Sequence, residues 1–201
     1  MNSLMFSTIA FSQTGKDIHV LDWQSAFSKS YEFESKKNYK EAINSLNSIY
    51  QDNSYEINLR LGWLCFNAKE NKKSIEYYRK AIALKPNSIE ARFGYIKPAS
   101  TLEKWDIVFE QYQEILKIDK QNTYANYWIG MMYYNRSNFS QALKHFETVV
   151  NLYPFDADAN LMAGWSEFKL GKKDDAKRYF QETLLIYPNN ASALEGMSYV
   201  K

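Results

Sequence analysis

Few side chains in this sequence are suited to acid–base, nucleophilic or metal chemistry. The 201 residues include two histidines, His19 and His145, and one cysteine, Cys65. A structural zinc site needs several Cys or His ligands, and a single cysteine cannot form an internal disulfide bond. Cys65 falls in an apolar helix pattern, where it is expected to act as a small hydrophobic residue. We therefore expect no metal and no cofactor.

One segment superficially resembles a phosphate-binding loop. Gly164 is followed by Gly171 and Lys172, but six residues separate the two glycines, which is too many for a P-loop. Lys173 stands where a P-loop has the serine or threonine that holds magnesium. We interpret the segment as a turn between two helices.

Two pairs of neighbouring carboxylates are the remaining candidates for acid–base chemistry. They are Glu32 with Glu34, and Asp174 with Asp175. Both pairs are expected at polar turn or surface positions, where solvent surrounds them. We predict that the chain is not an enzyme.

The charge pattern argues against a nucleic-acid partner. The chain has 25 Lys and Arg residues against 23 Asp and Glu residues, and they are intermixed. A nucleic-acid binder usually gathers its basic residues into a stripe that contacts phosphates. No apolar stretch approaches the length of about eighteen residues that a transmembrane helix needs. We expect neither nucleic-acid binding nor a transmembrane segment.

The N-terminus carries a short apolar run at Leu4–Phe11. Ala10 and Ser12 provide small residues at the two positions that a signal peptidase reads, although no basic residue precedes Lys16. We interpret residues 1–12 as the remnant of an export signal, which predicts an exported or periplasmic protein. The alternatives are a cytoplasmic location and an apolar N-terminus that packs on the first helix.

The elements that position the side chains recur with a period of about 34 residues. Gly62 and Gly130 lie two periods apart, and Gly164 lies one period further on. A second small residue, an aromatic residue and a proline follow each glycine at fixed offsets. These residues are Ser74, Ala142 and Ala176; Tyr78, Phe146 and Phe180; and Pro86, Pro154 and Pro188. Small residues let two antiparallel helices approach closely, and proline ends the second helix.

This pattern resembles the tetratricopeptide repeat. The resemblance implies an all-α fold, a right-handed superhelical solenoid of antiparallel helix pairs with about five repeats and a terminal helix. The expected segments are an N-terminal segment at 1–22, repeats at 23–54, 55–88, 89–122, 123–156 and 157–190, and a terminal helix at 191–201.

Two of the repeats depart from the pattern. The first is two residues short in its closing loop and lacks the proline. The third has Ile96, Val108 and Lys120 where glycine, alanine and proline are usual, and it carries Pro98 inside its first helix. Since proline removes a helix hydrogen bond, we expect this helix to be kinked or shortened. The repeat is either simply degenerate or a hinge.

The family resemblance implies that the first helix of each pair lines a concave groove. The residues carried over to this groove are mainly aromatic and aliphatic. They are Tyr31, Trp63, Phe66, Asn67, Phe93, Lys97, Tyr127, Trp128, Met131, Tyr134, Trp165 and Phe168, together with Phe27, Leu59 and Leu161. Trp63, Met131 and Trp165 recur at one repeat position, with Lys97 interrupting the row. Packing within the repeats is the competing explanation for Phe66, Tyr134 and Phe168.

The groove predicts a scaffold or adaptor that binds an apolar or amphipathic segment of another protein or peptide. Lys97 and Arg60 are expected to be isolated charges, so a clamp for a carboxylate is not expected. The alternative is binding of a carbohydrate or cell-envelope glycan through the Trp and Tyr rings. The apolar Leu194 and Met197 of the terminal helix predict self-association, or the start of a further repeat.

Overall fold

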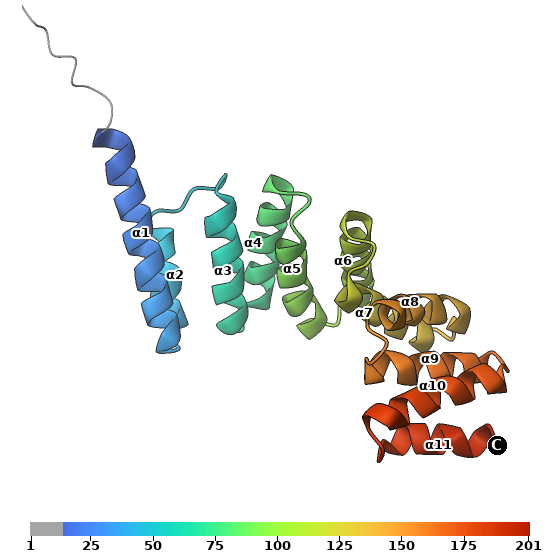
Figure 1. Ribbon diagram of the computed structural model, residues 1–201. Coiled ribbons are helices and arrows are strands. Elements are labelled where there is room, and N and C mark those ends of the chain that lie inside the picture. The colour runs from blue at the N-terminus through green and yellow to red at the C-terminus, as the bar shows by residue number, and fades with distance from the viewer. Residues whose placement is uncertain (1–13) are drawn as a thin grey trace, which may run out of the picture. The chain divides into compact units, whose positions relative to one another are not determined.

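The computed structural model describes residues 14–201, and their side chains from residue 22 onward. This part of the chain forms eleven helices and no strand (Figure 1). The helices are α1 (Thr14–Ser35), α2 (Tyr39–Asn47), α3 (Tyr55–Asn67), α4 (Asn71–Leu84), α5 (Ile89–Thr101), α6 (Trp105–Ile118), α7 (Thr123–Asn135), α8 (Phe139–Leu152), α9 (Ala157–Lys169), α10 (Lys173–Ile186) and α11 (Ala191–Tyr199). The predicted all-α helical-repeat fold is confirmed.

Consecutive helices pack as pairs within two compact units, the described residues up to Pro98 and residues 99–201. In the first unit α1 packs on α2 and α3 on α4; in the second, α7 packs on α8 and α9 on α10. Short turns join the partners, which makes them antiparallel neighbours. No described helix is long and apolar enough to cross a membrane. The predicted signal remnant at Leu4–Phe11 lies outside the described residues.

Aromatic wedges fill the space between neighbouring helices. Phe180 is fully buried and lies against Gly164 of its own pair and Gly196 of the next helix. A Cβ atom at either glycine would come within 3.0 Å of the Phe180 ring. Tyr78 lies against Gly62 in the same way. The glycines of the repeat pattern therefore make room for an aromatic ring, in addition to letting the helix backbones approach each other.

The starts of the first helices are capped with the same period. Side-chain oxygens of five residues accept a hydrogen bond from the backbone N–H three residues later, at 2.8–3.2 Å. The capping residues are Ser54, Ser88, Asn122, Asp156 and Asn190. A cap of this kind satisfies one of the N–H groups that a helix start leaves without a partner. The caps fix where each first helix begins.

Pro98 does not shorten its helix. α5 has 13 residues, the same number as α3, α7 and α9. Pro98 is fully buried and three more helical residues follow it. Of the two expected effects, the shortening was therefore wrong, and the kink stays a prediction.

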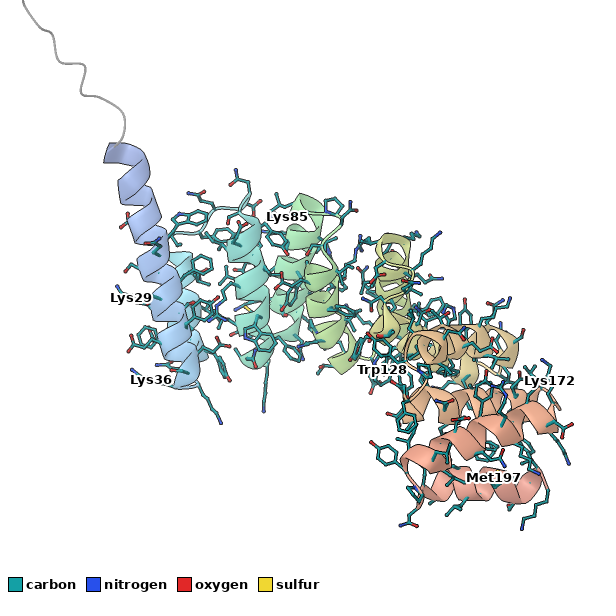
Figure 2. All side chains as sticks on the ribbon, viewed as in Figure 1. Lys29, Lys36, Lys85, Trp128, Lys172 and Met197 are labelled. Atoms are coloured by element: carbon teal, nitrogen blue, oxygen red, sulfur yellow. The ribbon has the colours of Figure 1, made fainter. Side chains whose placement is uncertain are left out.

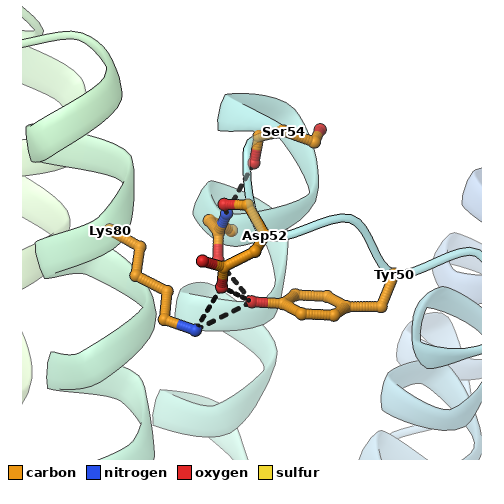
Figure 3. Close-up of polar contacts among 5 residues, drawn as sticks. Tyr50, Asp52, Ser54 and Lys80 are labelled. Carbon is orange, nitrogen blue, oxygen red and sulfur yellow. Dashed lines mark hydrogen bonds and ion pairs between the residues drawn. The ribbon is translucent and has the colours of Figure 1, made fainter.

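A polar network stabilises the short loop that lacks proline. Figure 3 shows Lys80 Nζ donating to Asp52 Oδ1 at 2.6 Å and to the Tyr50 hydroxyl at 3.0 Å. The Tyr50 hydroxyl donates to the same carboxylate at 2.8 Å. The hydrogen bond from Lys80 lowers the pKa of Asp52. This network joins the loop after α2 to α4.

Candidate functional site

The first unit contains an open groove of about 910 Å³ between α1, α3 and α5. Its lining includes four residues of the predicted set, Tyr31, Trp63, Phe93 and Lys97, as well as the related Phe27 and Leu59. The remaining lining residues are Tyr55, Glu56, Arg60, Tyr78, Ile89, Glu90 and Gly94. Most of the lining is therefore ring or aliphatic surface.

Several lining residues were missed at the level of sequence, although their spacing was informative. Tyr55 and Ile89 lie one repeat period apart, and so do Glu56 and Glu90. They occupy the first turns of α3 and α5. The prediction carried over positions deeper in each helix and stopped short of the helix starts.

Glu34 connects α1 to α3 at one wall of this groove. Its carboxylate pairs with Arg60 Nη2 and accepts a hydrogen bond from Trp63 Nε1. Arg60 Nε also donates to Ser30 Oγ at 3.3 Å, and the guanidinium lies 3.8 Å from the centroid of the Tyr31 ring. The expectations that Glu34 is solvated and that Arg60 is an isolated charge were wrong. The partners sit on different repeats, so sequence spacing alone did not bring them together.

Cations of the chain cover further rings in the first unit. Lys97 Nζ lies 4.7 Å from the centroid of Trp63, and Lys85 Nζ lies 4.0 Å from that of Tyr55. An ammonium group over a ring face is attracted by the negative potential of that face. Lys97 therefore covers the Trp63 ring, where an interruption of the aromatic row was expected.

Two predicted residues of the first unit lie beside the groove lining. Phe66 contacts Trp63, with ring centroids 6.4 Å apart. Asn67 Nδ2 donates to the backbone carbonyl of Trp63 at 2.9 Å. Both residues support Trp63 from within α3.

In the second unit, α11 covers two of the predicted residues. Trp165 Nε1 donates to Ser192 Oγ at 2.9 Å, and the Trp165 ring contacts Phe180 and Tyr199. Phe168 stacks on Tyr199 with centroids 5.6 Å apart. Trp165 and Phe168 thus contribute to packing between α9 and α11.

The other predicted residues of the second unit differ in exposure. Tyr127, Met131 and Tyr134 are half-buried against the cluster that includes Phe146. Trp128, labelled in Figure 2, is 40% exposed. Its ring lies 5.7 Å from that of Tyr127 and 6.2 Å from that of Tyr124, centroid to centroid. Tyr124 is also exposed and was not predicted.

Burial shifts the pKa values of Cys65 and His145, which lie outside the groove. Burial raises the pKa of Cys65 to about 12, so its thiol is protonated at neutral pH. Burial lowers the pKa of His145, whose Nδ1 lies 2.9 Å from Asn126 Oδ1. Among residues 22–201, no three His, Cys, Asp or Glu side chains form a group that could hold a metal ion.

Comparison with known proteins places the repeats in one family. Family models of the tetratricopeptide repeat match residues 55–88 and 129–191. The TPR repeat-containing protein MJ1428 of Methanocaldococcus jannaschii is 26% identical over 142 residues, which cover 66% of this chain and 24% of that protein. The chain therefore spans about a quarter of the length of this relative.

Solved structures share the fold. A MamA protein has a TM-score of 0.71 at 19% identity, over 85% of this chain and 94% of its own. A tetratricopeptide repeat protein from Parabacteroides merdae has a TM-score of 0.74 at 18% identity, over 90% and 72%. YrrB, described as a TPR protein with an unusual peptide-binding site, has a TM-score of 0.70 at 16% identity, over 86% and 90%.

Proposed function

Because this chain is a tetratricopeptide-repeat protein, we propose that it is a non-catalytic scaffold that binds an apolar or amphipathic polypeptide segment. The observation that carries the proposal is the groove of about 910 Å³ lined by α1, α3 and α5. Aromatic residues bury a large area at a low cost in conformational entropy, which suits them to interface cores. The peptide-binding site described for YrrB is consistent with a ligand of the same class.

The charged residues of the groove lining are also compatible with an apolar ligand. The one nearly buried charge of the lining, Arg60, already pairs with Glu34. Lys97 lies against the ring of Trp63. A partner therefore meets ring and aliphatic surface without having to neutralise a buried charge, which would cost several kcal/mol, on the order of 3 to 5.

Selection from a random peptide library tests the proposed function. We expect the wild-type chain to enrich peptides with apolar or aromatic residues, and Trp63→Ala to lose them because it removes a ring of the groove. Trp105→Ala is the matched control, since Trp105 is exposed on α6 outside the groove. Circular dichroism first establishes that all three chains fold. Equal enrichment by all three would contradict binding in this groove.

We do not propose carbohydrate binding through Trp63 or Trp165, because their surroundings do not favour it. A ring that stacks on a sugar needs an open face and polar groups around it. Lys97 covers the ring of Trp63, and the indole N–H groups of Trp63 and Trp165 donate to Glu34 and Ser192.

The compartment is a separate part of the proposal. We place the chain in an exported or periplasmic compartment on the basis of the apolar run at Leu4–Phe11. Residues 1–22 fused to a phosphatase that is active only after export should give phosphatase activity. Replacing two apolar residues of the run with aspartate should abolish that activity. An inactive fusion with the natural residues would favour the cytoplasmic alternative.

A further inference from the structure

In the first unit, two rings on α1 and α3 are each covered by a cation of the chain. The guanidinium of Arg60 lies 3.8 Å from the centroid of Tyr31, and the ammonium of Lys97 lies 4.7 Å from that of Trp63. Each cation comes from the helix that follows its ring along the row α1, α3, α5. A cation supplied by the chain itself therefore covers each of these two rings.

The α7 face of the second unit lacks such a cation. The segment Thr123–Asn135 contains no charged residue. Within the described part of the chain, no Lys or Arg lies over the ring of Trp128 or Tyr127. Trp128 is nevertheless 40% exposed, so part of its side chain is accessible to a partner.

The indole N–H of Trp128 also differs from those of the other two tryptophans in the predicted groove. Trp63 donates to Glu34 and Trp165 donates to Ser192. Trp128 Nε1 has no acceptor among residues 22–201. An indole donor without an acceptor, on an exposed tryptophan, can bind a backbone carbonyl of a partner while the ring contacts a side chain.

Carboxylates accompany these rings from the neighbouring helix. Asp158 lies in the first turn of α9, which packs on α7, and the charges of Asp158 and Asp156 contribute to the raised pKa of Tyr127 after the larger effect of burial. Asp156 caps α9 by accepting a hydrogen bond from Ala159 N at 2.8 Å. Asp158 is exposed, and the described residues offer it no ion-pair partner. The face thus combines negative ring surfaces with an available negative charge.

We propose that Trp128, Tyr127 and Asp158 bind a lysine or arginine side chain of the partner polypeptide. The inference rests on the proposed function only in that the partner is a polypeptide. The side chain's cation lies over the ring of Trp128, and Asp158 adds charge complementarity. The contact reproduces from outside the arrangement that Lys97 forms with Trp63 in the first unit.

Peptide selection followed by one isosteric change tests this site. A random dodecapeptide library is selected on the full wild-type chain, on Trp128→Ala and on Asp158→Asn, with Trp105→Ala as the control for an exposed tryptophan elsewhere. We expect the wild type and Trp105→Ala to enrich peptides with Arg or Lys at a fixed position. Both site variants should lose that preference.

An enriched peptide is then synthesised with arginine or with citrulline, which has nearly the same shape without the charge. Wild type should bind the citrulline peptide about three- to thirtyfold more weakly, the range of a cation–π contact. In Asp158→Asn, the affinities for the arginine and the citrulline peptides should differ less than in the wild type. This variant also tests the site if Trp128→Ala fails to fold. Equal affinity for the two peptides, or a basic preference that survives both variants, overturns the site. Peptides that depend on Trp63 and not on Trp128 overturn the site and leave the proposed function standing.

Discussion

Three buried asparagines stabilise the loops between repeats by hydrogen bonds. None of them was singled out from the sequence. Asn58, Asn126 and Asn160 follow the period of the repeats. Each Nδ2 donates to two backbone carbonyls, six and four residues earlier in the chain, at 2.7–3.0 Å. The same side chain thus satisfies a loop carbonyl and a carbonyl at the start of the following helix.

Asn160→Leu should lower the free energy of unfolding by about 2 kcal/mol, because the carbonyl of Pro154 loses its side-chain donor. The carbonyl of Asp156 keeps its hydrogen bond from the backbone N–H of residue 160, and Asn160 itself is 1% exposed. Urea unfolding followed by circular dichroism measures the change.

The control is Asn151→Leu, since Asn151 lies exposed on α8. We expect a change of about 0.5 kcal/mol or less there. Equal changes at both sites would mean that the buried asparagine does not hold the loop.

At the scale of elements, the first helices end in a repeated backbone conformation. The residue in the turn after each of them has a positive φ. These residues are Lys37, Lys69, Glu103, Ser137 and Gly171, with φ of 58°, 63°, 55°, 58° and 81°. Only one of the five is glycine, the residue that adopts this left-handed conformation most easily. The other four turns therefore carry local strain.

Ser137→Gly should raise the free energy of unfolding by about 1 kcal/mol, because it removes the steric cost of a side chain in the left-handed region. Thermal unfolding measures the gain. Ser140→Gly is the control, since Ser140 is an exposed helical residue of α8. Glycine lowers stability there by about 0.5 kcal/mol. A loss of stability in both variants would contradict the explanation.

The helix pairs could be predicted because glycine, aromatic residue and proline recur at fixed spacing. Gly164 and Phe180 do lie in contact. The continuation of α5 past Pro98 could not be predicted, because the missing N–H group and the proline ring act on the preceding turn, and the repeat pattern does not contain the packing that holds that turn. Cap residues such as Asn122 were equally periodic, and a search for N-capping residues at the same period would have found them.

At the scale of the whole molecule, the rings of the candidate site were easier to predict than the groups around them. Trp63 follows from its repeat position, whereas its partners Glu34 and Lys97 belong to the helices on either side. Those pairings depend on how neighbouring repeats pack on one another, and the spacing of residues within one repeat does not give that geometry. Likewise, the contacts of Trp165 with Ser192 and Tyr199 could not be predicted, because α11 lies after the last full repeat and the repeat pattern does not say how it packs.

The periodicity of the caps also sets which changes in chain length the molecule tolerates. Between Ser54 and Asn190, the cap, the aromatic wedge and the left-handed turn return once in every period. So does the buried asparagine, except that Arg92 takes its place in one repeat and donates from Nη2 to the carbonyl of Pro86 at 2.9 Å. Duplication or loss of one whole period keeps every one of these groups beside its partner. An insertion of another length inside a helix rotates the wedge away from its glycine, about 100° for each added residue. Gene duplication can therefore lengthen this chain in steps of one repeat, with single-residue changes confined to loops such as the one that Lys80 fastens.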